Sequence, residues 1–257
     1  MPYVDAPGAR IWFEDVEGSG PPLVLAHPAT GTAQIWADQV TAFARRGYRV
    51  ITYDRRGAGR STIRPGTGSH TSDLAHLVDH LDLPGAHLIG AALGACDVLE
   101  YAVAQPGRVR SVVISNSYGG LDDPGHRATI AQLWHPGLLR LPPHVLELSP
   151  TLRGTRPDRV AEWLAIHSNA APEPPDDELP MGVSRHDLET LRLPALVVAG
   201  SADLLAPPFL MERLSRYIPG AEFAVIDDSG HASPFERPEA WNARVAMFLE
   251  SQERSAR

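Results

Sequence analysis

The alternation of short apolar runs with amphipathic stretches constrains the fold of this chain more than any other feature. Six runs of mostly aliphatic residues have the length and composition of buried strands. Between them, apolar residues recur at three- and four-residue spacing, as in helices that bury one face. The 24 prolines and 22 glycines fall mostly between these segments, where they end strands and helices. The apolar runs are 23–26, 50–53, 87–89, 112–114, 196–199 and 223–226, and the helical stretches are 35–45, 74–81, 93–104, 209–217 and 241–249.

Alternating strands and helices predict an α/β fold, a doubly wound and mostly parallel sheet with helices on both faces. The alternation stops between residues 118 and 191, where the pattern indicates helices and no strand. We therefore expect a core built from residues 1–117 and 192–257 and an inserted helical cap, or lid, at 118–191. Near its end the proline-rich, acidic stretch 171–180 is expected to be a solvated connector.

Composition excludes several classes of protein. Of 257 residues, 43% are hydrophobic and 21% charged, which is typical of globular proteins and not of disordered or fibrous ones. The net charge is −8 and the cations are not clustered, so we expect no nucleic-acid partner. A single cysteine, Cys96, excludes an intramolecular disulfide framework. The sequence shows no signal-like N-terminus and no apolar run of membrane-spanning length, so a cytoplasmic location and no membrane association are expected.

A glycine-flanked alanine follows the predicted strand 87–89. Gly90 and Gly94 stand two residues before and two after Ala92, at the start of a predicted helix. A strand that turns abruptly into a helix strains its central residue, and side chains at the two flanking positions would collide. Such an elbow presents a nucleophile, but the methyl group of Ala92 cannot attack a substrate. The pattern predicts the scaffold of a nucleophile elbow without the nucleophile.

With these motifs the chain resembles the α/β-hydrolase superfamily, in particular its esterase- and lactonase-like members with a helical cap. GAALGA at 90–95 is similar to the superfamily's GxSxGG elbow, and HPATG at 27–31 to its oxyanion loop. DRRGAGRS at 54–61 is similar to the DxRGxGxS loop, and QPGRVR at 105–110 to the segment after the elbow helix. The resemblance covers roughly the whole chain and is strongest outside 118–191.

The resemblance implies a catalytic acid and base. Asp203, in the turn after the run 196–199, matches the position of the triad carboxylate, and His231, after the run 223–226, matches that of the histidine. In such a site Asp203 holds the His231 ring in one tautomer and stabilises its protonated form, and His231 transfers the proton. Together with Ala92 at the nucleophile position, these are the predicted catalytic residues.

The resemblance also implies an oxyanion hole and a substrate pocket. The expected donors are the backbone N–H groups of Ala29 and Leu93. Pro28 stands where glycine is usual and removes one N–H group, but it leaves that of Ala29. His27, Trp134 and Trp163 are predicted to contact a small-molecule substrate. No metal and no cofactor is expected, and a homodimer is compatible with the sequence.

The original nucleophile is inferred from its neighbours. Relatives that open epoxides or carbon–halogen bonds have Asp followed by Trp, whereas Leu93-Gly94 accompanies serine; cysteine stays open as an alternative. Ala92 has two explanations, either replacement of a serine in order to trap substrate or natural loss, and the intact oxyanion loop, acid and base favour replacement. The predicted function is a serine-type hydrolase of an ester, lactone or related acyl substrate, inactivated at Ala92. The alternatives are a nucleophile-free lyase, cyclase or cofactor-independent oxygenase with His231 as base, and a ligand-binding pseudoenzyme.

Overall fold

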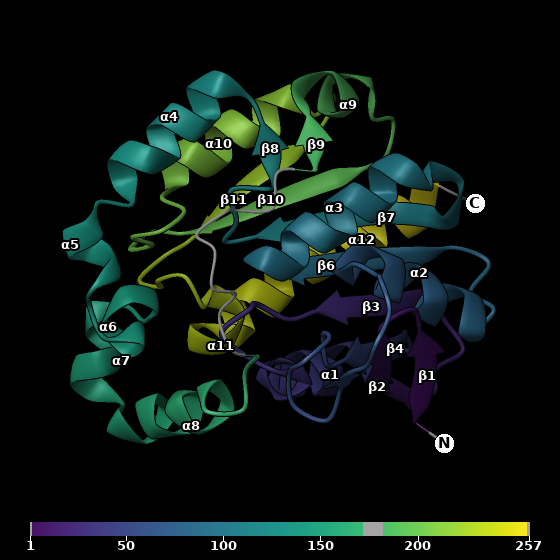
Figure 1. The fold of residues 1–257 in the computed structure, drawn as a ribbon. Coiled ribbons are helices and arrows are strands. Elements are labelled where there is room, and N and C mark those ends of the chain that lie inside the picture. The colour runs from purple at the N-terminus through teal and green to yellow at the C-terminus, as the bar shows by residue number, and fades with distance from the viewer. Residues whose placement is uncertain (1, 172–181, 256–257) are drawn as a thin grey trace.

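A mostly parallel sheet forms the centre of the computed structural model, which describes residues 2–171 and 182–255 (Figure 1). All six predicted strands are present, and they pair in parallel in the order β4-β3-β6-β7-β10-β11. The predicted doubly wound fold is therefore confirmed. These strands are β3 (Pro22–Ala26), β4 (Arg49–Tyr53), β6 (Ala86–Ala91), β7 (Val109–Ser115), β10 (Ala195–Gly200) and β11 (Glu222–Ile226).

An antiparallel extension at the N-terminal edge was not expected from the sequence. Strand β2 (Ala9–Val16) pairs antiparallel with β1 (Tyr3–Ala6), with β4 and with the short β5 (Thr62–Ile63). Side chains along the first half of β2 alternate between buried and partly exposed, which is the two-residue period of a strand with one face covered.

Helices cover both faces of the sheet and create two apolar cores. One core contains residues of α2 (His70–His80), α3 (Leu93–Ala104) and α10 (Pro208–Tyr217). The other contains residues of α1 (Ala37–Ala44) and α12 (Pro238–Ser255). Along β6, Leu88 belongs to the first core and its neighbour Ile89 to the second, as expected for successive side chains of a strand. Short 3₁₀ helices, Ala33–Trp36 and Pro106–Arg108, complete the loops after β3 and α3.

The inserted segment, residues 118–191, lies between β7 and β10, and α4 to α8 form an arc along one side of the molecule (Figure 1). Each of these five helices has proline in its first turn, where the missing N–H group costs no hydrogen bond. They are α4 (Pro124–Leu133), α5 (Pro136–Leu139), α6 (Pro143–Glu147), α7 (Pro150–Thr155) and α8 (Pro157–His167); α9 (Arg185–Thr190) precedes β10.

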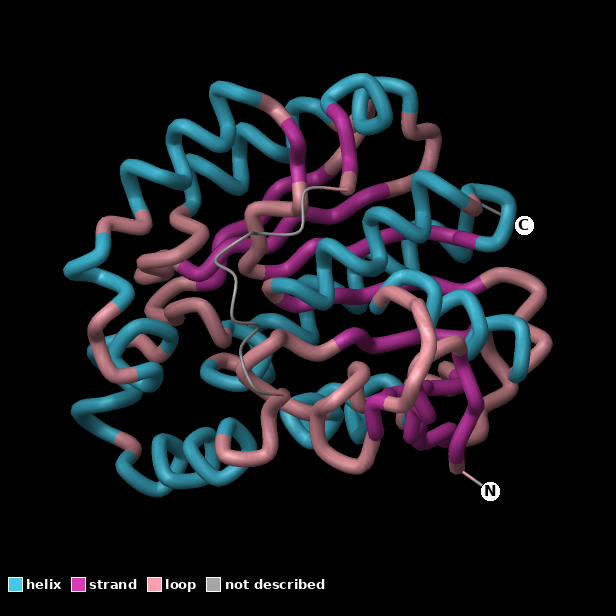
Figure 2. Tube along the Cα trace, in the orientation of Figure 1, coloured by secondary structure: helices cyan, strands magenta, loops and turns pink. Residues whose placement is uncertain are grey.

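The expectation that the inserted segment contains no strand is wrong. Strands β8 (Leu121–Asp122) and β9 (Val183–Ser184) form a small parallel sheet near the two ends of the segment (Figure 2). Two residues are too few to show a strand period in the sequence. The predicted solvated connector, 171–180, lies outside the described residues apart from Ala171. Of the helices that the structure describes, none is long and apolar enough to cross a membrane.

Candidate active site

The elbow between β6 and α3 has the strained geometry that the glycine pattern predicts. Ala92 has φ 48° and ψ −118°, a conformation that residues other than glycine rarely adopt. A Cβ atom on Gly90 would lie 2.4 Å from the backbone nitrogen of Ala95, and one on Gly94 would lie 2.3 Å from the carbonyl oxygen of Ala26. Both glycines are therefore required by close backbone approach. The side chain of Ala92 is partly exposed at this turn.

Asp203 and His231 are hydrogen bonded, as predicted. The Nδ1 atom of His231 lies 2.9 Å from Oδ2 and 3.0 Å from Oδ1 of Asp203. The N–H groups of Leu205 and Ala206 each donate to Oδ1 of Asp203 at 2.9 Å, which fixes the orientation of the carboxylate. The two residues come from the loops that follow β10 and β11, at the carboxyl ends of parallel strands. The Nε2 atom of His231 has no hydrogen-bond partner within the described part of the chain and is available to a substrate.

The acid and base stabilise each other's charged forms. Burial alone would raise the pKa of Asp203, but the charge of His231 and the hydrogen bonds to the carboxylate outweigh burial and lower it. Burial would likewise lower the pKa of His231, and the charge of Asp203, followed by those of Glu147 and Glu236, raises it instead. A raised pKa makes His231 a stronger base once its proton has left.

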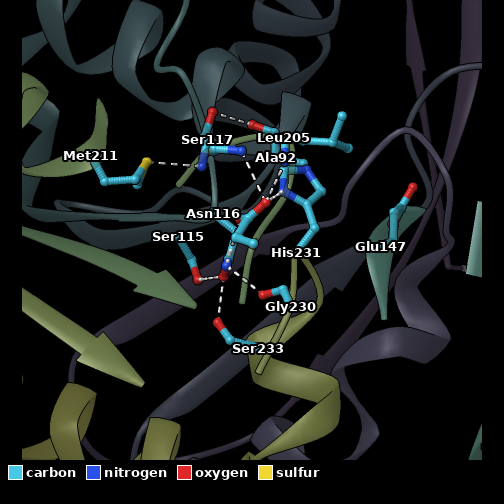
Figure 3. A network of polar contacts seen from close by, with 12 residues as sticks. Ala92, Ser115, Asn116, Ser117, Glu147, Leu205, Met211, Gly230, His231 and Ser233 are labelled. Atoms are coloured by element: carbon cyan, nitrogen blue, oxygen red, sulfur yellow. Dashed lines mark hydrogen bonds and ion pairs between the residues drawn. The ribbon is translucent and has the colours of Figure 1, made fainter. Parts of the chain in front are cut away.

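Asn116, directly after β7, connects the acid loop, which follows β10 and carries Asp203, to the histidine loop, which follows β11 and carries Gly230 and His231. Figure 3 shows Asn116 close to Gly230 and His231. Its Nδ2 group donates to Oδ2 of Asp203 at 3.1 Å and to the carbonyl oxygen of Gly230 at 3.0 Å. Its Oδ1 atom accepts hydrogen bonds from Ser115, at 2.9 Å, and from Ser233. Our sequence reasoning missed this residue. The available signal was a run of polar residues, 115–117, at the carboxyl end of a central strand.

Two buried glutamates also belong to the site and were missed. The carbonyl oxygen of Glu147, at the end of α6, accepts the N–H group of His231 at 2.7 Å, and its carboxylate accepts the hydroxyl of Thr30 at 3.0 Å. Glu236, in α11 (Ser233–Glu236), accepts the N–H groups of Gly230 at 2.7 Å and Ser149 at 2.8 Å. Apart from the bond between Gly230 and Glu236, these contacts join residues distant in sequence, so no local pattern indicates them.

The predicted oxyanion donors lie on the expected loops. Leu93 is the first residue of α3, and N–H groups in the first turn of a helix have no acceptor within the helix. The N–H group of Ala29 makes no hydrogen bond to the residues that the structure describes. Both residues are partly exposed. The arrangement can therefore offer two N–H groups to a developing oxyanion.

His27 supports this loop from inside the protein, which corrects the expectation that it contacts substrate. It is fully buried, and its Nε2 atom accepts the N–H group of Arg55 at 2.8 Å. The other ring nitrogen, Nδ1, therefore carries the proton and donates to the carbonyl oxygen of Pro28 at 2.6 Å. Burial and the charge of Arg55 lower the pKa of His27 to about 3, so the ring is neutral.

The two predicted tryptophans occupy different environments. Trp134 is partly buried, belongs to the apolar cluster around Tyr118 that also includes Leu93, and donates its Nε1 proton to the carbonyl oxygen of Leu205 at 2.9 Å. Trp163 is only 1% exposed and stacks on His167 with ring centroids 5.0 Å apart. Trp163 packs the inserted segment onto the core. A side chain this buried has no surface to offer to a substrate, which corrects the prediction for Trp163.

The cavity beside His231 is small. Its volume is about 10 Å³, and both Ala91, next to the elbow, and Glu147 line it. A larger, open hollow of about 660 Å³ lies elsewhere, between Trp12, Arg60 and His80. Neither of these cavities is a sizeable apolar pocket at the elbow, where the resemblance implies that substrate binds. The cavity lining consists of Pro28, Ile35, Trp36, Ala91, Glu147, His231, Ala232, Pro234 and Phe235.

The loop after β4 is hydrogen bonded to the oxyanion loop and its surroundings. Asp54 accepts the N–H groups of Ala33 at 2.8 Å and Arg60 at 2.9 Å. Arg55 forms a buried ion pair with Asp97 of α3 at 2.7 Å. Together with the bond from the Arg55 N–H group to His27, they connect the loop after β4 to the oxyanion loop, to the 3₁₀ helix that follows it and to α3.

Other candidate groups have no evident chemical role. The Cys96 thiol is buried, and burial raises its pKa to about 12, so it carries little thiolate at neutral pH. Within residues 2–171 and 182–255, no group of three or more His, Cys, Asp or Glu side chains could hold a metal ion.

An elbow after a central strand, together with an acid and a histidine after the last two strands of a doubly wound sheet, defines a hydrolase of the α/β fold. Residues 23–244 match the model of the alpha/beta hydrolase family, and the chain belongs to this family. The putative non-heme bromoperoxidase BpoC of Mycobacterium tuberculosis is 31% identical over 260 residues, covering 92% of this chain and 97% of that protein.

Two further similar proteins bear on the chemistry. The putative carbamate hydrolase RutD of Azorhizobium caulinodans is 29% identical, with 96% of this chain and 98% of that protein covered. A solved structure described as Est816, an N-acyl homoserine lactone degrading enzyme, superposes with a TM-score of 0.78 at 29% identity and covers 96% of this chain and 100% of that one.

Proposed function

We propose that this protein has the site of an ester or lactone hydrolase in which alanine occupies the position of the nucleophilic serine. The observation that carries the proposal is the hydrogen-bonded Asp203–His231 pair, whose histidine lines the same small cavity as Ala91, the residue before Ala92. The similarity to a lactone-degrading enzyme and to a putative carbamate hydrolase supports an acyl substrate. The substrate is a small molecule, and no cofactor takes part.

With serine at position 92, the residues would carry out acyl transfer in two steps. The serine Oγ atom attacks the acyl carbon while Nε2 of His231 takes its proton, and the N–H groups of Ala29 and Leu93 bind the oxyanion. The leaving alcohol departs with that proton and an acyl-enzyme forms. Water then attacks the acyl carbon, its proton passes through His231 to the serine oxygen, and the carboxylic acid leaves.

With Ala92, no acyl-enzyme can form. In a serine hydrolase, removal of the serine costs about 10⁶-fold in turnover, while the oxyanion donors and the binding site keep a residual rate. The protein as it stands should therefore bind an ester or lactone and consume it very slowly.

Substitution of Ala92→Ser tests the proposal directly. We expect hydrolysis of activated esters and of a panel of lactones to rise by several orders of magnitude, because serine would restore the nucleophile to an elbow that retains the acid and base. Mass spectrometry should find an acyl group on residue 92. Ala92→Ser combined with His231→Gln is the control, and it should remain as slow as the Ala92 protein.

A different outcome would favour another class of protein. If the Ala92→Ser variant is inert and the Ala92 protein converts another substrate only when His231 is intact, a nucleophile-free enzyme with His231 as base replaces the hydrolase. If neither protein turns over any compound but a small molecule raises the melting temperature, the site is that of a ligand-binding protein.

A further inference from the structure

Glu147 is the only residue of the inserted segment, among those that the structure describes, that contacts both the oxyanion loop and the histidine loop through hydrogen bonds of its own. Its carbonyl oxygen accepts the N–H group of His231 at 2.7 Å. Its carboxylate accepts the Thr30 hydroxyl at 3.0 Å, and Thr30 follows the oxyanion residue Ala29. A single residue therefore joins two loops that contribute to the candidate site.

The carboxylate lies inside the protein, beside the catalytic cavity. Glu147 is 4% exposed and lines the same small cavity as His231. The hydroxyl of Thr30 donates to Oε2, and Oε1 has no hydrogen-bond partner in the described part of the chain. Burial of an ionised carboxylate costs free energy unless hydrogen bonds or opposite charges compensate it. The carboxylate of Glu147 has one neutral donor, the Thr30 hydroxyl, and the imidazole of His231 nearby, so a functional role explains its burial better than packing does.

We propose that Glu147 is a positioning residue of the site, through which the inserted segment sets both the charge state of His231 and the placement of the oxyanion loop. The inference rests on the proposed hydrolase function. Glu147 would not touch the reacting atoms; its carboxylate favours the protonated histidine, and its bond to Thr30 holds the loop that carries Ala29.

The electrostatic surroundings of both groups agree with this role. The charged groups that act on His231 are Asp203 after β10, Glu147 at the end of α6 and Glu236 in α11, and each raises the pKa of the imidazole against the effect of burial. For Glu147, burial raises the carboxyl pKa above its usual value, and the charge of Asp203 adds to this, although the charge of His231, the Thr30 hydroxyl and the charge of His167 oppose it. The two groups therefore titrate as a coupled pair.

Glu236, the other buried glutamate of the site, offers a comparison for the way in which a carboxylate is held here. Glu236 is also buried, but both its oxygens accept backbone N–H groups, those of Gly230 and Ser149. Its carboxylate is thereby used to join the histidine loop to the start of α7. In Glu147, by contrast, the backbone carbonyl group accepts the N–H group of His231, and the carboxylate accepts only the Thr30 hydroxyl. Its negative charge can therefore act on the imidazole of His231.

The first test is the titration of His231 by NMR in the Ala92 protein, which does not depend on turnover. Glu147→Gln keeps the size of the side chain and the acceptor for Thr30 but removes the charge, so the midpoint of the His231 titration should shift to lower pH. Glu162→Gln, in the exposed part of α8, removes a carboxylate from the same segment and should leave the midpoint unchanged. An unchanged midpoint in a folded Glu147→Gln protein would overturn the proposal.

Variants of Thr30 keep the proposal testable if Glu147→Gln does not fold. Thr30→Val removes the hydroxyl, which destabilises the ionised carboxylate of Glu147, so the midpoint should shift in the same direction by a smaller amount. Thr30→Ser retains the hydroxyl and should restore the parent value. Equal midpoints in all three proteins would contradict the coupling.

A second readout separates this proposal from the proposed function. In the Ala92→Ser background, Glu147→Gln should move the acidic limb of the kcat/KM profile to lower pH, because His231 must be unprotonated to act as base. If Ala92→Ser restores hydrolysis but Glu147→Gln changes neither profile nor midpoint, the role of Glu147 fails and the hydrolase stands. If the midpoint shifts and Ala92→Ser is inert, the coupling stands and the hydrolase fails.

Discussion

Ala92 holds a backbone conformation that costs an alanine free energy and costs a glycine almost none. Its φ angle is positive, 48°, because the chain turns sharply from β6 into α3 at this residue. The turn is so tight that a Cβ atom on Gly90 or Gly94 would lie less than 2.5 Å from backbone atoms. Strain of this kind is of the order of 1–3 kcal/mol per residue. The elbow retains this strain even though alanine cannot use it for attack.

We expect substitutions within the elbow to have opposite effects on stability. Ala92→Gly should raise the free energy of unfolding by about 1 kcal/mol, because glycine relieves the strained φ angle. Gly90→Ala should lower it by about 1–3 kcal/mol, because its methyl group would meet the backbone of Ala95. Urea denaturation measures both values. A loss of stability in Ala92→Gly would contradict the strained elbow.

Sequence reasoning identified the residues of the site whose position follows from one local motif. The glycine spacing predicted the elbow, and the resemblance of two motifs to those of the α/β hydrolases implied Asp203 and His231, which the structure shows to be hydrogen bonded. Asn116 and Glu147 escaped prediction because their contacts depend on loops brought together by the fold. His27 was misjudged for a similar reason: nothing in HPATG reveals that Arg55, 28 positions along the chain, donates to its ring.

At the scale of elements, the loop after β4 and helix α3 are joined by a buried ion pair. The side chains of Arg55 and Asp97 are 5% and 6% exposed, so neither charge is compensated by water. Burial raises the pKa of Asp97 above its usual value, although the charge of Arg55 and its hydrogen bond oppose that effect. Removal of one partner leaves the other buried and unpaired.

Asp97→Asn should therefore lower the free energy of unfolding by about 3–5 kcal/mol. Asp79→Asn is the matched control, because Asp79 forms an exposed ion pair with Arg108 and its loss should cost less than about 1 kcal/mol. Thermal and urea denaturation at neutral pH compare the two variants. Similar, small losses of unfolding free energy in both variants would show that groups other than Asp97 stabilise the buried charge of Arg55.

Length explains which elements the sequence predicted. Five of the six parallel strands are short, mostly apolar runs that are buried along almost their whole length, which gives a strong local signal. The sixth, β11, is less buried, with Val225 40% exposed, but its run of apolar residues still marks it as a strand. In β2 the buried positions Ala9, Ile11 and Phe13 alternate with partly exposed ones, and we overlooked this weaker pattern. Strands β8 and β9 have two residues each, and they are strands only because they pair with each other in the folded protein.

Across the whole molecule, the inserted segment shares an apolar core with one face of the sheet. Trp163, Ile166, Leu148 and Leu152 belong to the same cluster as Phe43 and Trp241 of the helices on that face. Because the core is shared, the inserted segment and the sheet cannot separate without exposing apolar side chains of both.

The homodimer with which the sequence is compatible stays a prediction.

We expect Trp163→Ala to destabilise the whole molecule and not the inserted segment alone. The loss should be about 3–5 kcal/mol in the free energy of unfolding, and far-UV circular dichroism and tryptophan fluorescence should still report one transition. Leu164→Ala is the control, because Leu164 is 39% exposed and its truncation should change stability by about 0.5 kcal/mol or less. Two separate transitions would show that the segment unfolds independently.

The pairing of β8 with β9 brings the outgoing and returning chain of the inserted segment side by side. Leu121 pairs with Val183 and Asp122 with Ser184, so everything between them begins and ends at one narrow stem. Insertions with adjacent ends disturb their host least. A replacement segment joined at this stem would keep the connections to β7 and β10, but it would have to supply its own acceptor for the N–H group of His231, as Glu147 does, and its own apolar side chains against the sheet.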